Sequence, residues 1–507
     1  MKKPKLDKKH RKPKSKRSKK SVRKKLCISG KIHRVAIESI TPDPRNARTH
    51  SKKQTGQIAI SIKQFGFINP IIVDQNGMII AGHGRYKAAK SLEMTKVPVI
   101  RIKHLNKAQK RALMLADNKI AENAGWDLDI LAAELEELSI ALPELDIDLE
   151  ITGFSTGESD QILGDYQEQP SEPAEIIEPM DDLPPISCRG YLWQLGKHLL
   201  LCGDSRNQKI VVYLFGDKFA IMIITDPPYN VKVQGHVGGR GKVKHQEFAF
   251  ASGEMSDEEY QLFLAQTLRN MVEVCVDGGL IYSFIDWRHI EVLLACGTKL
   301  GLVLKNICVW NKTTPGQGSF YRSAHELIVV FQKLGAKSIN NIELGKYGRN
   351  RTNVWSYPGV NTFKTGSSDE LSIHPTVKPV TMIMEAIKDA SRRNDIVFDP
   401  FLGSGTTMLA AEKVGRRCYG IEYEPKYVDT AIRRWQELTC KDAVLIADNI
   451  GQDDGSEIDQ PSPSAELPET GAASTFINLT FDEIEQRQRG EENDAAALNA
   501  EQTGETS

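Results

Sequence analysis

Two consecutive prolines follow an apolar run near the middle of the chain, and this junction constrains the fold more than any other stretch. Residues 221–224 are all Ile or Met, which predicts a buried strand of a parallel sheet. Pro227 and Pro228 must end that strand, because neither can donate a hydrogen bond to a neighbouring strand. We therefore expect an α/β fold in which Asp226-Pro227-Pro228-Tyr229 forms a rigid turn at the carboxyl edge of the sheet, where such folds bind ligands.

A glycine-rich loop is the second strong motif. Residues 396–399 are typical of a strand, residues 400–405 of a glycine-bearing loop and residues 406–414 of a helix. The next strand ends at Glu422, roughly twenty residues after the loop, a spacing at which an acid can accept hydrogen bonds from both hydroxyls of a ribose. Taken alone, this loop and acid fit a dinucleotide as well as S-adenosylmethionine.

The order of the two motifs resembles that of a known family, the DNA amino-methyltransferases of the circularly permuted group called beta. In that group Asp-Pro-Pro-Tyr precedes the glycine-rich loop, as it does here, and His374-Pro375-Thr376-Val377-Lys378-Pro379 fits the same pattern. The resemblance covers residues 186–445. It implies a Rossmann-like domain that uses S-adenosylmethionine and needs no metal.

The resemblance also implies a role for each motif. Asp226 and the Pro227 carbonyl would accept hydrogen bonds from the exocyclic amine of an extruded base, held by the turn through Pro228, and Tyr229 would stack on its ring. Asp204 would meet the adenine amine of the cofactor. The expected cofactor-binding residues are Asp204, Asp399, Pro400, Phe401, Gly403, Ser404, Gly405, Thr406, Glu422, His374 and Lys378.

Each of these motifs has a purely structural alternative. The tetrapeptide can be a proline turn that caps a strand, Asp204 with Ser205 a helix N-cap, and Lys378 a surface residue at a helix start.

The expected reaction is methylation of the N6 amine of adenine at a specific sequence of double-stranded DNA. Adenine is favoured because Asp heads the tetrapeptide, whereas relatives that act on the cytosine amine more often carry Ser there. Residues 335–372, with Arg349, Arg351, Trp355 and Tyr357, are the candidate for target-base recognition because they mix cations with stacking aromatics. Two alternatives stay open: an N4-cytosine methyltransferase, and a partition-like DNA-binding adaptor with a vestigial methyltransferase domain. A restriction-modification context is expected, but no nuclease motif is evident.

A smaller α/β domain is expected before the catalytic one, at residues 29–151. Two short apolar runs, 71–73 and 78–81, flank an Asp-Gln-Asn-Gly turn, which predicts a hairpin. The stretch resembles the amino-terminal domain of ParB partition proteins and their sulfiredoxin-like relatives, which makes a nucleotide a candidate ligand. Gly82-His83-Gly84-Arg85 stands where ParB proteins usually carry Gly-Glu-Arg-Arg. Arg85 at a helix start could hold a phosphate, or His83 and Arg85 could be simple surface residues.

Helices are expected over residues 107–150, where apolar residues recur at helical spacing and are interpreted as core. These residues are Leu113, Leu115, Ile120, Leu128, Leu131, Leu135 and Leu138, with Trp126 among them. The domain boundary is expected in an acidic linker at residues 152–185, which are rich in Glu, Asp, Pro and Ser.

The two ends of the chain carry opposite charge and cancel to a formal net charge of +0. Residues 1–28 are expected to be a basic disordered arm that contacts phosphates, and residues 446–507 an acidic disordered tail. Within that tail, residues 476–481 form a short amphipathic patch that could dock on a partner.

The remaining composition excludes several classes of protein. The 8 cysteines form no CxxC pair and have no His at ligand spacing, so neither a disulfide framework nor a metal site is expected. No apolar run could span a bilayer and the amino terminus has no signal core, which predicts a cytoplasmic protein without membrane contact. A homodimer is left open.

Overall fold

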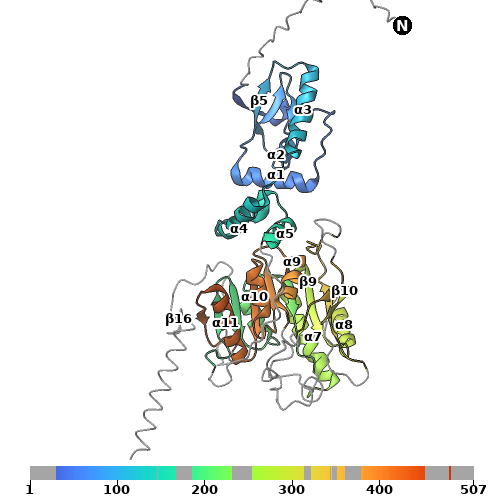
Figure 1. The fold of residues 1–507 in the computed structure, drawn as a ribbon, viewed down its shortest axis with the longest axis vertical. Helices are drawn as coiled ribbons and strands as arrows, with labels where there is room; N and C mark the ends of the chain where they lie inside the picture. Colours follow the sequence, from blue (N-terminus) through green and yellow to red (C-terminus); the bar gives the residue numbers. More distant parts are fainter. Residues whose placement is uncertain are drawn as a thin grey trace, which may run out of the picture. The chain divides into compact units, whose positions relative to one another are not determined.

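The computed structural model of the chain describes residues 30–145, 147–166, 185–230, 254–312, 321–342, 344, 351–359, 378–451 and 479–480. Contacts between residues divide it into two compact units, Met1–Trp126 and Asp127–Ser507 (Figure 1). The expected basic arm, residues 1–28, lies outside the described residues.

The described part of the first unit is a five-stranded sheet with helices α1, α2 and α3 (Figure 1). Its strand order is β1-β5-β3-β4-β2, and β3 and β4 form the antiparallel hairpin predicted around the Asp-Gln-Asn-Gly turn. The Asp74 carboxylate accepts hydrogen bonds from the backbone of Asn76 and Met78 and thereby fixes that turn. The elements are β1 Ile32–Ala36, η1 Ile37–Ser39, β2 Thr41–Pro42, α1 Lys52–Phe65, β3 Ile71–Asp74, β4 Met78–Ala81, α2 His83–Ser91, β5 Lys96–Ile102 and α3 Lys107–Glu122.

The prediction of a core from helical spacing is wrong for part of α3 and α4. Leu115, Ile120, Trp126 and Leu128 are 61%, 69%, 68% and 64% exposed, whereas Leu135 is 1% exposed. The reason is that α3 needs only one face, around Met114, to cover Ile80 and Ile102 of the sheet. Leu115 and Ile120 lie outside that contact.

The second unit is built on one large sheet with helices on both faces (Figure 1). The strand order among the described residues is β12-β10-β11-β9-β8-β13-β14-β7-β6-β15-β16. Strands β9, β8, β13, β14 and β7 are parallel neighbours, as expected for a Rossmann-like domain. The elements are α4 Leu128–Glu144, η2 Leu149–Thr152, α5 Thr156–Tyr166, β6 Leu192–Leu195, β7 His198–Cys202, α6 Gln208–Phe215, β8 Ala220–Thr225, α7 Asp257–Glu273, β9 Cys275–Ile285, α8 Ile290–Lys299, β10 Val303–Asn311, β11 His325–Gln332, β12 Val354–Ser356, α9 Val380–Ala390, β13 Ile396–Asp399, α10 Thr406–Lys413, β14 Arg417–Glu422, α11 Pro425–Thr439, β15 Val444–Ala447 and β16 Leu479–Thr480.

The predicted strand at residues 221–224 lies at the centre of this sheet and packs against helices on both faces. Met222 and Ile224 of β8 belong to the core on the side of α9, α10 and α11. Ile223 belongs to the core on the side of α6, α7 and α8. A strand buried on both faces needs a continuous apolar run, which explains why the sequence here does not alternate with polar residues.

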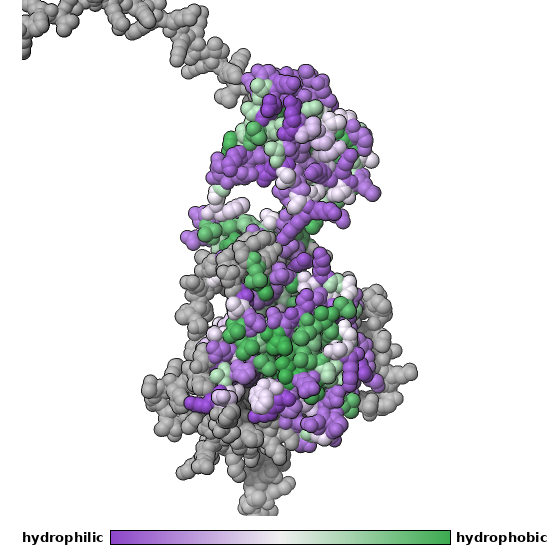
Figure 2. Space-filling model, turned by 90° about the vertical axis from the view of Figure 1, so that its right-hand side faces the viewer, coloured by the Kyte–Doolittle hydropathy of each residue, from purple (hydrophilic) through white to green (hydrophobic). Residues whose placement is uncertain are grey.

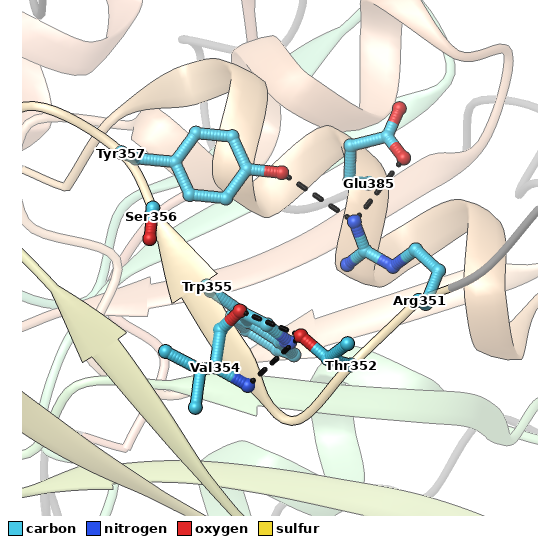
Figure 3. A pocket seen from close by; sticks show the side chains of 7 residues that line it. All are labelled: Arg351, Thr352, Val354, Trp355, Ser356, Tyr357 and Glu385. Carbon is cyan, nitrogen blue, oxygen red and sulfur yellow. Dashed lines mark hydrogen bonds and ion pairs between the residues drawn. The ribbon is translucent and has the colours of Figure 1, made fainter.

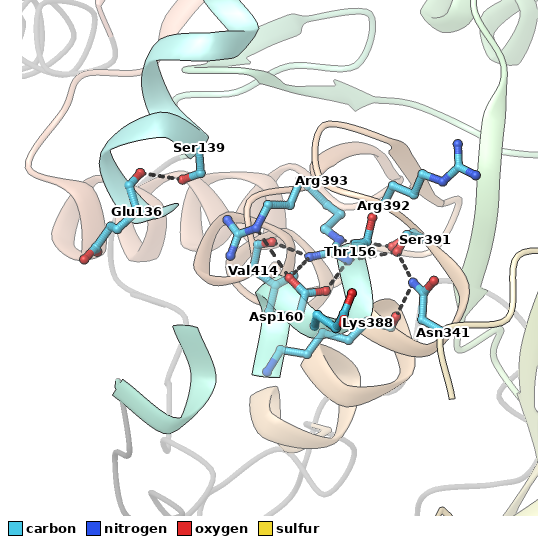
Figure 4. Close-up of polar contacts among 12 residues, drawn as sticks. Glu136, Ser139, Thr156, Asp160, Asn341, Lys388, Ser391, Arg392, Arg393 and Val414 are labelled. Carbon is cyan, nitrogen blue, oxygen red and sulfur yellow. Dashed lines mark hydrogen bonds and ion pairs between the residues drawn. The ribbon is translucent and has the colours of Figure 1, made fainter. Parts of the chain in front are cut away.

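Helix α5 occupies residues that we expected to form the start of an acidic linker. Its Asp160 (Figure 4) is 1% exposed. Both terminal nitrogens of Arg416 donate to the Asp160 carboxylate, at 3.0 and 2.7 Å. Arg416 also donates to the backbone carbonyls of Val414 and Ser391. The compact units divide between Trp126 and Asp127, so α4 and α5 belong to the second unit and not to the ParB-like stretch.

The expected acidic tail also contributes to the fold. β15 continues to Ala447, and β16, within the amphipathic patch, pairs with β15 in the register Leu445↔Leu479 and Val444↔Thr480. The described part of this patch therefore docks on the chain's own sheet. Residues 452–478 and 481–507 lie outside the described residues.

The two units differ in the surface that they present in Figure 2. The first unit is mostly hydrophilic in this view, whereas apolar side chains gather on one face of the second unit. Within the described ranges, no helix is both long enough and apolar enough to cross a membrane.

Candidate active site

Four acidic residues lie at the carboxyl ends of four neighbouring parallel strands. Thr225 ends β8 and is followed by Asp226, Asp399 ends β13, Glu422 ends β14, and Asp204 follows β7 by two residues. The backbone N–H of Gly203 donates to the Glu422 carbonyl at 2.8 Å, which holds the last two strand ends together. The sequence predicted each of these acids, and the fold brings their strand ends to one edge of the sheet.

The Asp226–Tyr229 turn is held from two sides. The Tyr260 hydroxyl of α7 donates to the Pro228 carbonyl at 3.0 Å, and the Tyr229 hydroxyl donates to the Asp226 carboxylate. Asn230, in the left-handed region at φ 53°, exchanges hydrogen bonds with the backbone of Met255. Pro227 is buried, while the Asp226 side chain keeps 26% of its surface exposed. The turn is therefore rigid and its carboxylate reaches the surface.

Lys378 lies against this carboxylate, although we expected it to cover the cofactor. Its ammonium donates to Asp226 and lies 3.2 Å from Glu326, and its side chain is only 6% exposed. The rings of Phe284, Trp310 and Tyr229 surround the ammonium with centroids at 5.1, 5.8 and 5.9 Å. The alternative of a surface residue at a helix start is therefore excluded for Lys378.

Glu326 and Lys312 complete a four-charge cluster that the sequence analysis missed. Glu326 is 11% exposed, and its second oxygen binds Lys312 at 2.5 Å. Because β10 and β11 are antiparallel with Trp310 opposite Glu326, the strand pairing brings these two side chains together. The only sequence signal was a charged pair, His325-Glu326, at the start of a strongly apolar strand.

The charges of the cluster shift the pKa values of its two carboxylates, Asp226 and Glu326, in opposite directions. Burial raises the pKa of Asp226; Lys378 lowers it, Glu326 raises it again, and the net shift is upward. Burial acts in the same direction on Glu326, but the charges of Lys378 and Lys312 outweigh it and lower the pKa of Glu326 to about 2. Asp226 is therefore the carboxylate of the pair that takes up a proton first.

Both carboxylate oxygens of Asp399 accept hydrogen bonds from within the protein. One oxygen accepts from the Thr225 hydroxyl at 3.0 Å and the Phe401 backbone at 3.1 Å, and the other accepts from the Thr407 hydroxyl at 2.6 Å. Burial raises the pKa of Asp399 to about 6 against these hydrogen bonds. Asp399 thus fastens the glycine-rich loop to the end of β8, one residue before Asp226.

The glycine-rich loop has the backbone that its glycines predict. Gly403 and Gly405 have φ of 54° and 87°, in the left-handed region that favours glycine. The Ser404 carbonyl accepts from Arg434 at 2.7 Å, and Phe401 packs against Phe263. Pro400 and Thr406 are buried at the two ends of the loop.

We predict that Gly405→Ala disrupts this loop more than Gly403→Ala does. A Cβ at Gly405 would lie 2.8 Å from the Ala431 Cβ and 3.1 Å from its Cα, whereas a Cβ at Gly403 would meet nothing within 4 Å. Both changes carry the backbone cost of a left-handed residue, of about 1 kcal/mol, but only Gly405→Ala adds overpacking of about 1–3 kcal/mol. Urea midpoints of the two variants measure the difference, and equal midpoints would contradict this account of the loop.

Glu422 and Asp204 are both held by hydrogen bonds, but only Glu422 keeps acceptor sites open. Glu422 accepts from the backbone of Gly403 and of Glu424, each at 2.8 Å. Burial raises the pKa of Glu422 to about 7. Asp204 forms a two-pronged ion pair with Arg206, which stands beside it in the loop, and is 30% exposed. A carboxylate has about four acceptor sites. Glu422 uses two of them and can still accept from a ligand, whereas Asp204 already accepts four hydrogen bonds from Arg206, so a ligand there would replace one of these bonds.

The segment expected to recognise the target base is partly described. Arg351, Trp355 and Tyr357 line a pocket of about 300 Å³ around β12 (Figure 3). Arg351 is tied to Asp389 at 2.8 Å and to Glu385 at 3.3 Å, and Trp355 is only 6% exposed. Arg351 and Trp355 are thus largely committed to the protein's own packing. Arg349 and His374 lie outside the described residues.

A second pocket, of about 410 Å³, lies in the first unit, and Arg48, His50, His83 and Lys87 are among the residues that line it. His83 begins α2 and is 7% exposed, so it is not the surface residue of the alternative interpretation. Burial lowers the pKa of His83, as do His50 and Lys87. Arg85 is not part of the lining; it folds over Gly82 instead. No group of three or more metal-binding side chains is found within the described ranges.

Three family models match the chain. A DNA methylase model for N6 and N4 enzymes matches residues 220–433, a ParB N-terminal domain model matches residues 22–119, and a ParB-methyltransferase HTH domain model matches residues 129–189. The last of these overlaps α4 and α5.

Individual proteins resemble different parts of the chain. The type II methyltransferase M.HinfI of Haemophilus influenzae is 29% identical over 233 residues, which is 43% of this chain and 63% of that protein, less than two thirds of its length. The ParB-like nuclease domain-containing protein YnaK of Escherichia coli K12 is 49% identical over 75 residues, 15% of this chain and 86% of YnaK. Among solved structures, the M1.HpyAVI–SAM complex shares 20% identity over 46% of this chain and 97% of that chain, with a TM-score of 0.33.

Proposed function

Because the chain combines a ParB-like amino-terminal domain with a domain of the N6/N4 DNA methylase family, we propose that it transfers a methyl group from S-adenosylmethionine to an exocyclic amine of DNA. The observation that carries the proposal is the Asp226–Tyr229 turn, which presents a partly exposed carboxylate and an aromatic ring at the ligand-binding edge of a parallel sheet.

The residues at this edge fit S-adenosylmethionine. The ligand is a cation that carries hydroxyl and amino donors, and the edge offers the carboxylates of Asp204 and Glu422. Glu422 would accept from the ribose hydroxyls and Asp204 from the adenine amine. The open space beside Gly403 lets a ligand approach the loop backbone. When bound, the cofactor supplies a methyl group that is already activated by its sulfonium.

The protein's own task is to orient the amine and exclude water. An amine conjugated to a base ring is planar and a poor nucleophile. Hydrogen bonds from its N–H groups to Asp226 and to the Pro227 carbonyl favour a tetrahedral nitrogen with a free lone pair. The hydroxyl of Tyr229 is fixed on Asp226, so its ring is held in place for stacking. The raised pKa of Asp226 makes it a competent acceptor for the proton that the methylated amine loses.

Adenine N6 is the proposed target because Asp heads the tetrapeptide, and cytosine N4 is the alternative within the same family. A specific sequence of double-stranded DNA is the proposed partner. Residues 129–189 hold 17 acidic residues and a single basic one, so we expect this segment to repel phosphates despite the HTH domain model that matches it. We assign phosphate contacts instead to the basic residues 1–28. The pocket of the ParB-like domain is the proposed site for a nucleotide.

Purified full-length protein tests the proposal directly. Incubated with duplex DNA and S-adenosylmethionine labelled in the methyl group, it should transfer the label to DNA, and digestion to nucleosides should yield N6-methyladenine. Detection of N4-methylcytosine instead would show that the target base is cytosine, while the proposed methyl transfer to an exocyclic amine would stand. Failure to bind the labelled cofactor at all would favour the DNA-binding adaptor.

A further inference from the structure

Glu326 lies beside Asp226 although the proposed chemistry requires no contact between Glu326 and the substrate. It lies at the start of β11, between Lys312 at 2.5 Å and Lys378 at 3.2 Å. Removing a carboxylate from water costs free energy, and here two lysines compensate the charge of this one carboxylate. Such an arrangement indicates that Glu326 has a function. Glu326 reaches the residues of the Asp226–Tyr229 turn through Lys378 and through the Tyr229 hydroxyl, which donates to it at 3.4 Å.

Lys378 is shared between two carboxylates. Its ammonium binds both Asp226 and Glu326, and three aromatic rings enclose it, so it cannot move into water. When the Lys378 ammonium lies closer to one of the two carboxylates, it stabilises the negative charge of the other carboxylate less. Lys312 acts on this balance from the far side, because it neutralises part of the charge of Glu326.

We propose that Glu326, backed by Lys312, is a positioning residue that sets how strongly Lys378 pairs with Asp226, and thereby how readily Asp226 accepts the proton of the methylated amine. This inference rests on the proposed methyl transfer. In that reaction the amine nitrogen bonds to the methyl carbon as the carbon–sulfur bond breaks, which leaves the nitrogen positively charged. An N–H bond then breaks, its electron pair stays on nitrogen, and the proton binds Asp226 and passes to water.

Five groups face Asp226 directly and determine its charge. Lys378 favours the ionised form, while Glu326 and Asp399 disfavour it, and Tyr229 donates a hydrogen bond to it. Tyr260 of α7 is coupled to it through its own raised pKa. Among these, Lys378 and Glu326 act with opposite sign, so their removal should shift the titration of Asp226 in opposite directions.

The test is the single-turnover rate of methylation as a function of pH, with full-length protein, saturating S-adenosylmethionine and duplex DNA. Activity requires ionised Asp226, so the rate falls as pH drops through its pKa. We expect Glu326→Gln to move this acidic limb down and Lys378→Met to move it up, by about one to three pH units each. Glu326→Gln with Lys312→Met removes one charge of each sign and should give a limb between those of wild type and Glu326→Gln.

Asp277→Asn is the control, because it removes one carboxylate from an exposed ion pair with Lys333 and should leave the limb in place. A purely structural role of Glu326 would lower the rate without a directional shift, and an unmoved limb in Glu326→Gln would overturn the inference. The order of Glu326→Gln and the double variant tests it again even if Lys378→Met does not fold. Absence of methylation by the wild type, by contrast, would refute the proposed function and not the role of Glu326 specifically.

Discussion

Asp226→Ala should lower the rate of methyl transfer by about 10²–10⁴-fold while leaving the affinity for S-adenosylmethionine nearly unchanged. In the proposed mechanism Asp226 contacts the amine chiefly in the transition state, so its loss should reduce turnover more than binding. The buried Lys378 ammonium does not lose its only carboxylate partner in this variant, because Glu326 lies 3.2 Å away. Single-turnover kinetics and a cofactor titration on the same preparation give the two quantities.

Asp226→Asn is the matched variant, because it keeps the shape of the side chain and removes only the charge. It should be nearly as inactive as Asp226→Ala if the carboxylate is what matters. Equal losses of cofactor binding and methylation in both variants would instead mean that Asp226 belongs to the cofactor site, and the assignment of the turn to the target amine would fall.

Arg416→Met should lower the free energy of unfolding by about 3–5 kcal/mol, the largest effect on stability that we expect from a single change. Both partners of the Arg416–Asp160 pair are buried, with exposures of 0% and 1%. The variant leaves the Asp160 carboxylate buried with Arg393 at 3.4 Å as its remaining charged contact among the residues in Figure 4. Urea unfolding followed by tryptophan fluorescence reports mainly on the second unit, which holds five of the 6 tryptophans.

Two further variants isolate the ion pair. Asp160→Asn combined with Arg416→Met removes both charges and should be more stable than Arg416→Met alone. Arg288→Met breaks an exposed pair with Asp286 and should cost no more than about 1 kcal/mol. A loss for Arg416→Met as small as that for Arg288→Met would show that α5 is not anchored to the rest of the second unit through this contact.

Sequence analysis predicted the site residues that stand next to a recognisable local pattern, such as an apolar run. Asp226, Asp399 and Glu422 each end or follow an apolar run, and parallel strands place such ends at one edge. Their assignment to the fold therefore needed no tertiary information. Their hydrogen-bond partners did need it: Asp399, which we expect to contact the cofactor, accepts hydrogen bonds from Thr225, Phe401 and Thr407.

The residues that sequence reasoning missed depend on contacts between distant segments. Glu326 meets Lys378 only because β11 and the segment before α9 converge at the sheet edge, and no local spacing marks that meeting. Asp160 and Arg416 are 256 positions apart, and their pairing keeps an acidic stretch helical and buried where composition predicted a linker. In both cases a buried ion pair joins segments that are distant in the sequence, and local periodicity does not reveal it.

The central claim, methylation of an amine in a specific DNA sequence, is tested most directly in living cells. The chain should be expressed in a bacterium that lacks DNA methylation, and the genome sequenced by a method that reads modified bases. We predict methylated adenines within one short sequence motif in cells with the wild-type chain and none in cells with Asp226→Ala. A genome that stays unmodified while the wild-type protein is soluble and abundant would contradict the claim.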